Sequence, residues 1–186
     1  KSCEKIKYMF PKAHAAAYVT NAFRIAWFKV HIPLAYYAAY YSIRAKAFDA
    51  QYMIFGKEKV KNKMKEIEMK NQKKEATKAE LDMYDDLEIV LEMYERGFEF
   101  LPVDIYESEA SKFKIQDNKL RPPLNSIPGF GTVAAQGIVN ARKDGKFMSI
   151  DDLKIRAKIG ASGAELLKQF GCLEGMSQSN QLSLFG

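Results

Sequence analysis

The 186-residue sequence contains few of the residues that cross-link small folds or bind metals, with two cysteines and two histidines in all. Cys3 and Cys172 lie near opposite ends without a CxxC spacing, which indicates no metal site and fits buried thiols as readily as a disulfide. No uninterrupted apolar run reaches the roughly 18 residues of a membrane span, and no signal peptide is visible. We therefore expect no membrane contact and a reducing, cytoplasmic location.

A catalytic constellation is also missing. No nucleophile is accompanied by a base and a third supporting residue. Asp85–Asp86 and Asp151–Asp152 are adjacent pairs. Neighbours on a helix point in different directions, so neither pair has the form of a two-metal site. The sequence therefore predicts no catalytic residue, no metal site and no cofactor within this chain.

The residues that are abundant are apolar or basic. Hydrophobic residues make up 47% of the chain, which is ample for the core of one domain or two small ones. The net charge of +6 favours acidic partners such as nucleic acid. The first residue is Lys1 rather than Met, and it falls inside a helical pattern, so we expect a piece of a longer protein.

The N-terminal quarter predicts two helices with little polar surface. Pro11 suits the first turn of a helix that runs to about Val30 and is stopped by Pro33. A second helix follows from Pro33 to about Ala47. Because both helices are apolar on most sides, we expect a larger body of protein to bury them.

The middle of the chain is strongly charged. Residues 56–74 contain eight lysines, interspersed glutamates and a narrow apolar stripe, which predicts a surface helix. Thr77 and Glu80 have the capping-box spacing before the next helix, and Gly97 suits the C-cap of that helix. The lysines allow a nucleic-acid surface, but the interleaved glutamates favour a solvated face.

From Phe98 the hydrophobic pattern becomes shorter. Residues 101–106 and 112–116 alternate as short strands, and Asp117–Asn118 supplies turn chemistry. With helical segments on both sides, this pattern predicts a mainly α fold with a short β section.

Residues 127–131, Ile-Pro-Gly-Phe-Gly, and the helical run that follows are typical of a helix-hairpin-helix element. Gly129 and Gly131 let the backbone turn tightly and approach a phosphate without a Cβ in the way. The next helix begins at Thr132, so its first N–H groups face the anion. Arg142 and Lys143 add positive charge nearby.

A weaker copy of this pattern begins about 32 residues later and includes Gly160 and Gly163. Paired elements of this kind hold duplex backbone without reading sequence. The alternative is that each glycine merely caps a helix in an ordinary bundle. Two units with basic residues near both favour duplex binding over that alternative.

A second constellation lies at the start of the first helix. Lys12 and His14 fall in the first turn, where an anionic ligand would meet both the helix dipole and their charge. Tyr8 lies just before them and could stack on a base. A solvated Lys12 and a His14 that hydrogen-bonds in a core explain the pattern equally well.

The chain ends in a short apolar peptide that follows the polar run 177–180. Its residues are Gln181, Leu182, Ser183, Leu184 and Phe185. Large apolar side chains at a chain end are not easily buried in their own domain. Their alternation in an extended segment suits capture by the pockets of a partner.

These motifs, in this order, resemble one family over essentially the whole chain. Residues 8–18 and 36–44 look like the fingers of bacterial replicative DNA polymerase III alpha subunits. Residues 101–104, 127–131, 145–153 and 180–185 resemble the PolC type of that family. The resemblance implies a cytoplasmic DNA-directed DNA polymerase with an exonuclease, whose catalytic carboxylates and magnesium sites lie upstream of this chain.

The resemblance also implies what each segment does. Residues 1–55 would end the fingers, 56–100 form a charged helical segment, 101–124 a β connector, 125–175 a tandem helix-hairpin-helix region and 176–186 a flexible tail. Tyr8, Lys12 and His14 would lie near the incoming deoxynucleotide. The hairpins would hold duplex DNA, and residues 181–185 would bind the sliding clamp.

Two alternatives come from other classes of protein. A non-catalytic adaptor that binds DNA and the clamp would share the hairpins and the tail, but it would have no need of a nucleotide-facing helix. A helical structural protein would carry the glycines and the tail incidentally and would bind neither DNA nor clamp.

Overall fold

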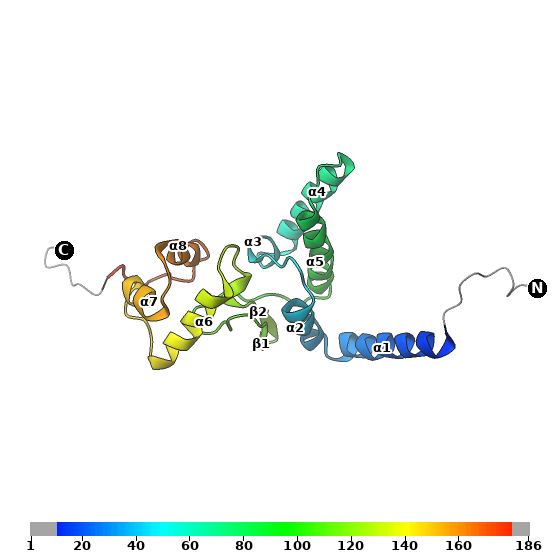
Figure 1. Cartoon of the computed structure of the whole chain (residues 1–186), viewed down its shortest axis with the longest axis horizontal. Coiled ribbons are helices and arrows are strands. Elements are labelled where there is room, and N and C mark those ends of the chain that lie inside the picture. The colour runs from blue at the N-terminus through cyan, green and yellow to red at the C-terminus, as the bar shows by residue number, and fades with distance from the viewer. Residues whose placement is uncertain (1–10, 180–186) are drawn as a thin grey trace, which may run out of the picture.

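The computed structural model describes residues 11–179 and shows a mainly helical chain with one small sheet (Figure 1). This is the mainly α fold with a short β section that the sequence predicts. In chain order the elements are α1 (Lys12–His31), α2 (Pro33–Ile43), α3 (Ala50–Met53), α4 (Lys57–Gln72), α5 (Lys78–Glu95), β1 (Lys114–Gln116), β2 (Lys119–Arg121), η2 (Leu124–Ser126), α6 (Thr132–Ala141), η3 (Arg142–Asp144), α7 (Ile150–Ala157) and α8 (Ala161–Gln169). Within residues 11–179, no helix combines the length and apolar character that a membrane crossing needs.

Helix α1 projects from one end of the molecule (Figure 1). Of its twenty residues, Lys29 alone is half-buried, and the others are exposed. The large apolar side chains left exposed on it are Tyr18, Val19, Phe23, Ile25, Trp27, Phe28 and Val30. By contrast, α2 buries Leu34, Tyr37 and Tyr41 within this chain. Of the two helices that the sequence predicts to be buried by further protein, α1 therefore presents such an apolar surface, whereas α2 is largely covered by this chain.

An aromatic cluster joins α2 to the β section and to α5. The ring of Tyr41 lies 5.2 Å from that of Phe48, 5.7 Å from that of Phe100 and 5.4 Å from that of Phe113. The Tyr41 hydroxyl donates to Met93 Sδ at 3.9 Å, and burial raises the pKa of this tyrosine well above its usual range. Aromatic pairs contribute about 0.5–1.5 kcal/mol each beyond the area that they bury, so this cluster is the centre of the core.

Helices α4 and α5 pack together as an arm (Figure 1). The predicted capping box begins α5, because the N–H of Glu80 donates to Thr77 Oγ1 at 3.2 Å and the N–H of Thr77 donates to Glu80 Oε2 at 2.8 Å. Gly97 ends the helix as predicted, with its N–H on the carbonyl of Tyr94 and that of the next residue on Met93. Both ends of α5 are therefore fixed by local bonds.

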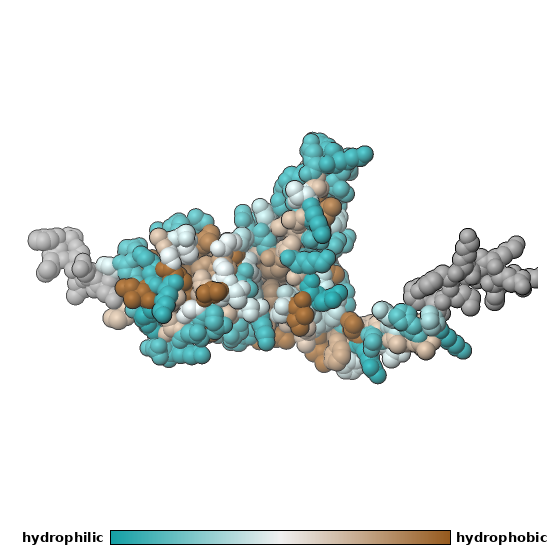
Figure 2. Space-filling view, viewed as in Figure 1, coloured by the Kyte–Doolittle hydropathy of each residue, from teal (hydrophilic) through white to brown (hydrophobic). Residues whose placement is uncertain are grey.

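The lysines of α4 make the arm strongly hydrophilic (Figure 2). Four of the eight lysines in residues 56–74 form ion pairs, namely Lys57, Lys61, Lys63 and Lys70. Two of these reach a single carboxylate, Glu95, at 3.2 Å each. These ion pairs between lysines and glutamates favour a solvated face for α4 over a surface that binds nucleic acid.

Strands β1 and β2 form an antiparallel hairpin whose turn residues, Asp117 and Asn118, have φ of 52° and 55°. This matches their predicted turn chemistry. The strand predicted at 101–106 is wrong. Asp104 Oδ1 instead accepts from the N–H of Tyr106 at 2.7 Å and from that of the next residue at 2.9 Å. Local side-chain bonds of this kind compete with strand pairing.

Helices α6, α7 and α8 pack together at the end of the molecule opposite α1 (Figure 1). Gly137 lies in the middle of α6, and a Cβ placed on it would overlap the carbonyl oxygen of Ala157 at the end of α7. The absence of a side chain therefore lets the two helices touch backbone to backbone. Sequence reasoning missed Gly137, because a glycine inside a helix resembles a weak helix former rather than a contact.

We predict that Gly137→Ala lowers the free energy of unfolding by about 3 kcal/mol, since the new methyl meets a carbonyl that belongs to the main chain and cannot swing aside. Urea unfolding measures the change. Val133→Ala, on the exposed side of the same helix, is the control and should stay within about 0.5 kcal/mol of the parent chain. Equal stability of the two variants would contradict the backbone contact.

Candidate nucleic-acid interface

The first hairpin joins η2 to α6. Gly129 has a φ of 78°, a left-handed conformation that glycine adopts without strain. The next side chain, Phe130, is buried in the core, and Gly131 is the N-cap of α6. Thr132 opens the helix, and its Oγ1 accepts from Asn125 Nδ2 at 3.2 Å. The turn thus places the start of α6 at the surface while anchoring itself by one aromatic ring.

The second hairpin joins α7 to α8 in the same way. Lys158 takes the left-handed position, with φ 54° and ψ 44°. Ile159 is buried, and Gly160 is the N-cap of α8. Lysine in the left-handed region is strained by roughly 1–2 kcal/mol, so the surrounding structure holds this turn in place.

The two hairpins are structurally equivalent. Adding 29 to a residue number in the first unit gives the corresponding residue in the second. The matched pairs are Gly129 and Lys158, Phe130 and Ile159, Gly131 and Gly160, Ala135 and Ala164, and Ile138 and Leu167. Every pair agrees in backbone conformation or in burial, so the repeat is real.

The spacing of about 32 residues expected from the sequence is therefore wrong. It pairs Gly131 with Gly163, but Gly163 lies inside α8. A Cβ on Gly163 would sit 3.4 Å from Phe130 Cε2, so this glycine makes room for the ring of the first hairpin. Its role is packing between the two units, not a turn.

Reciprocal contacts bind the two units together. Gly137 of α6 lies against Ala157, just before the second hairpin, and Leu166 of α8 lies against Gly129 in the first hairpin. Residues 137 and 166 are themselves related by the same shift of 29. Contacts that are exchanged in this way indicate an approximate twofold relation between the units.

Both helices begin with an N-terminus that no side chain of the described residues caps. Gly131 and Gly160 have ordinary φ values of −69° and −77°. A Cβ on Gly131 would meet nothing within 4 Å, and one on Gly160 would meet only Ser162 Oγ at 4.0 Å. The fold itself does not require glycine at either position, whereas close approach of an anion to the first N–H groups does.

The charge around the hairpins is only slightly positive. Residues 125–179 carry seven basic and five acidic side chains. Lys143, Lys146, Lys158 and Lys168 are exposed and form no ion pair within residues 11–179. Anion binding here would therefore depend on the helix N-termini first and on these lysines second.

Arg142 and Lys143, predicted together, have different surroundings. Arg142 Nη1 donates to the carbonyl oxygens of Ile105 at 3.1 Å and Ser108 at 2.6 Å, and Nη2 lies 3.8 Å from Glu109. Its side chain is only 14% exposed, so it links α6 to the irregular 101–113 segment. Sequence reasoning also missed Lys158, which lies in the second hairpin itself; a lysine two residues before an N-cap glycine was the available signal.

Comparison with known proteins agrees with this geometry. Residues 97–182 match the family described as the helix-hairpin-helix motif. The chain is 51% identical over 185 residues to the PolC-type DNA polymerase III of Caldanaerobacter subterraneus subsp. tengcongensis, 50% over 186 residues to that of Clostridium perfringens and 52% over 184 residues to that of Bacillus subtilis. The chain belongs to the PolC-type DNA polymerase III family. These alignments cover 99–100% of the chain, which spans 13% of the length of each relative.

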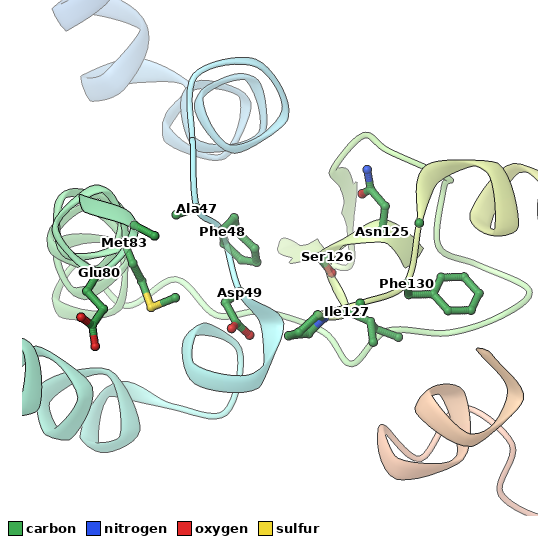
Figure 3. Close-up of a pocket in the computed structure, with 13 residues that line it drawn as sticks. Ala47, Phe48, Asp49, Glu80, Met83, Asn125, Ser126, Ile127 and Phe130 are labelled. Carbon is green, nitrogen blue, oxygen red and sulfur yellow. The ribbon is translucent and has the colours of Figure 1, made fainter. Parts of the chain in front are cut away.

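In this PolC-type chain the first hairpin also lines a cleft of about 540 Å³ (Figure 3). The facing wall carries Asp49, beside Phe48, and Glu80, at the start of α5. The Lys70 ammonium and the Thr77 N–H and hydroxyl lower the pKa of Glu80 to about 2. Asp49 accepts from the N–H of Gln51 at 2.7 Å, although burial raises its pKa. Both carboxylates are thus already engaged by groups of the protein.

The segment after α8 is bound to the start of α7. The N–H groups of Ile150 and Asp151 donate to the carbonyl oxygens of Ser177 at 2.9 Å and Gln178 at 3.1 Å. Gln178 Nε2 also reaches Asp151 Oδ1 at 3.4 Å, and a hydrogen bond from Lys154 lowers the pKa of that carboxylate. Two donors that a helix start normally leaves unsatisfied are therefore used to hold the chain.

The nucleotide residues predicted for PolC-type fingers are only partly described. Lys12 and His14 lie in the exposed first turn of α1, whose N-cap is Pro11 and which has no acidic residue in that turn. The ring of His14 lies 4.4 Å from that of Tyr18. Tyr8 and the tail residues 181–185 lie outside the described residues. Within residues 11–179 no three His, Cys, Asp or Glu side chains gather as metal ligands, and magnesium stays a prediction for the parent polymerase.

We predict that Arg142→Ala lowers the free energy of unfolding by about 2 kcal/mol, because two carbonyl oxygens lose their charged donor. Lys143→Ala is the matched neighbour and should change it by less than about 0.5 kcal/mol, since Lys143 has no such partners. Thermal or urea unfolding of both variants measures the difference. If the two variants were equally stable, Arg142 would not be the structural link that its contacts indicate.

Proposed function

We propose that this chain is the duplex-holding and tethering part of a PolC-type replicative DNA polymerase, which adds deoxynucleotides to a primer 3′ end. The observation that carries the proposal is the pair of equivalent hairpins, each of which ends in an uncapped helix N-terminus behind a glycine that the fold does not need. Identity of about half of the residues to polymerases over the whole chain supports it.

The hairpins would bind phosphates of duplex DNA. Their approximate twofold relation suits a duplex, because the two strands of DNA are themselves related by twofold axes and each hairpin would meet one strand. Base readout is not expected, since the groups offered at the two helix N-termini are backbone N–H groups, and the exposed amides of α6, Gln136 and Asn140, are bonded to each other. The chain would thus hold primer–template without selecting a sequence.

Helix α1 would serve the nucleotide side of the polymerase. Lys12 and His14, in the first turn of α1, would face the incoming deoxynucleotide together with Tyr8. Their exposure and the positive end of the helix dipole suit a triphosphate. The catalytic carboxylates, the magnesium ions and the exonuclease would belong to other parts of the polymerase, so we expect no polymerisation by this chain alone.

The C-terminal peptide would bind the sliding clamp of a cytoplasmic replication complex. Its residues are Gln181, Leu182, Ser183, Leu184 and Phe185. The peptide begins three residues after Gln178, which is bound with Ser177 to α7. A clamp that holds this peptide would keep the hairpins at high effective concentration near the duplex. Phosphate contacts alone would let the enzyme slide off, and the tether would limit that loss.

We predict that Gly131→Ala and Gly160→Ala each weaken binding to duplex DNA by about tenfold, or about 1.4 kcal/mol, because a methyl would hold the phosphate away from the N–H groups. Stability should change by less than about 1 kcal/mol, since the poorer N-cap is offset by a less flexible unfolded chain. Fluorescence anisotropy of a labelled duplex gives the affinity, and urea unfolding gives the stability.

Salt dependence distinguishes backbone contacts from charge in the same assay. Lys158→Ala should lower the slope of log affinity against log salt by about 1, whereas Gly131→Ala should leave that slope unchanged. Glu95→Gln, on the distant arm, is the control. Unaltered affinity in both glycine variants would refute phosphate binding at the hairpins.

We predict that Leu184→Ala together with Phe185→Ala abolishes binding of this chain to a bacterial sliding clamp, because both apolar anchors of the peptide are lost. Surface plasmon resonance on immobilised clamp measures the affinity. Ser183→Ala keeps the apolar anchors and should bind within about threefold of the parent chain. Clamp affinity that survives the double change would rule out the tether.

A further inference from the structure

Helix α1 contacts the rest of the described chain through its C-terminal end, where it packs on α2 and, through Lys29, on the end of α5. Lys29, one turn before Pro33, is its only half-buried residue, and the other residues of α1 are exposed. Its ammonium pairs with Glu92 Oε2 at 2.5 Å, and its carbonyl oxygen accepts from Arg96 Nη2 at 2.9 Å. Glu92 lies in the last turn of α5, and Arg96 is the C-cap of that helix. Main chain and side chain of one residue are therefore held by the same helix.

Arg96 is itself fixed by the core. Its Nη1 donates to the hydroxyl of Tyr37 at 3.1 Å, and that tyrosine is fully buried. The guanidinium lies 5.8 Å from the ring centres of both Tyr37 and Phe98. Glu92 Oε1 lies 3.8 Å from Nη1. A planar guanidinium with donors on two sides can thus connect the buried core of α2 to the carbonyl of Lys29.

The part of α1 that extends away from Lys29 is long. Lys12 precedes Lys29 by seventeen residues, which is about 25 Å along a helix that rises 1.5 Å per residue. A rotation of about 5° at Lys29 would move the first turn of α1 by about 2 Å over that length. Displacements of that size at a reacting group change rates by orders of magnitude.

We propose that Arg96, together with Glu92, is a positioning residue that sets the direction of α1 through Lys29 and thereby places Lys12 and His14. The inference rests on the proposed function for the role of those two residues. Its structural half does not, because the bonds to Lys29 would direct α1 whatever its first turn contacts. The two halves are therefore tested separately.

The structural half can be measured in the chain as it stands. Trp27 is the single tryptophan, lies on α1 two residues before Lys29 and is half-exposed. Time-resolved anisotropy of its fluorescence reports how far α1 moves on the nanosecond scale relative to the body. Arg96→Ala should raise the amplitude of the fast component about twofold, and Glu92→Gln should raise it by a smaller factor.

Two variants control this measurement. Glu95→Gln removes two ion pairs from the same helix without touching α1, and it should leave the anisotropy unchanged. Arg96→Lys keeps the charge but cannot bond Tyr37 and Lys29 together, so it should give an intermediate value. Because Glu92→Gln leaves Arg96 on the buried tyrosine, it tests the contact even if Arg96→Ala unfolds. An anisotropy decay that is the same in all these variants would overturn the proposal.

The functional half is measured in the complete polymerase. Arg96→Ala should raise the KM for the incoming deoxynucleotide about tenfold while leaving primer–template affinity unchanged, and Arg96→Lys should recover part of the loss. Lys12→Ala is run in parallel. If Lys12→Ala raises KM and Arg96→Ala does not, the positioning role is refuted. If neither raises KM, the assigned nucleotide role of α1 has failed, and the positioning role fails with it.

Discussion

The close contact between Gly137 and the carbonyl of Ala157 is the constraint on which the hairpin body depends. It lets α6 lie directly on the end of α7, next to the residue at which the second hairpin turns. The reciprocal contact, between Leu166 and Gly129, holds α8 against the first hairpin. Two glycines with open space above them, Gly131 and Gly160, then hold fixed places relative to one another. A side chain at Gly137 would push the two hairpins apart before it altered the conformation of either hairpin.

The chain divides into parts with different physical requirements. The hairpin body and α5 are self-sufficient, because caps, aromatic packing and a buried core satisfy them from within. Helix α1 is not, since its apolar side chains are exposed and only its C-terminal end contacts the described body, through α2 and through Lys29. The direction of such a helix is set by the contacts at its attached end. The arginine and glutamate at the end of α5 therefore matter more than their surface position suggests.

Local chemistry was the part of this structure that could be predicted from sequence. The capping box of Thr77, the stop at Gly97 and the turn at Asp117 all follow from bonds within a few residues. Errors arose where one side chain changed the outcome. Asp104 bonded its own backbone instead of a strand partner, and Lys158 took a left-handed position where the pattern led us to seek glycine. Gly137 and the inward-facing Arg142 could not be assigned, since their partners are distant in sequence.

The carbonyls of Ser177 and Gln178 on the start of α7 have a mechanical consequence. Helix α7 leads straight into the second hairpin at Lys158. A pull on the residues that follow Gln178 would load the two hydrogen bonds to the start of α7. Under the proposed function, tension from a bound clamp would therefore act on the second DNA-binding hairpin. The DNA-binding hairpins and the clamp-binding peptide would then be mechanically connected through α7.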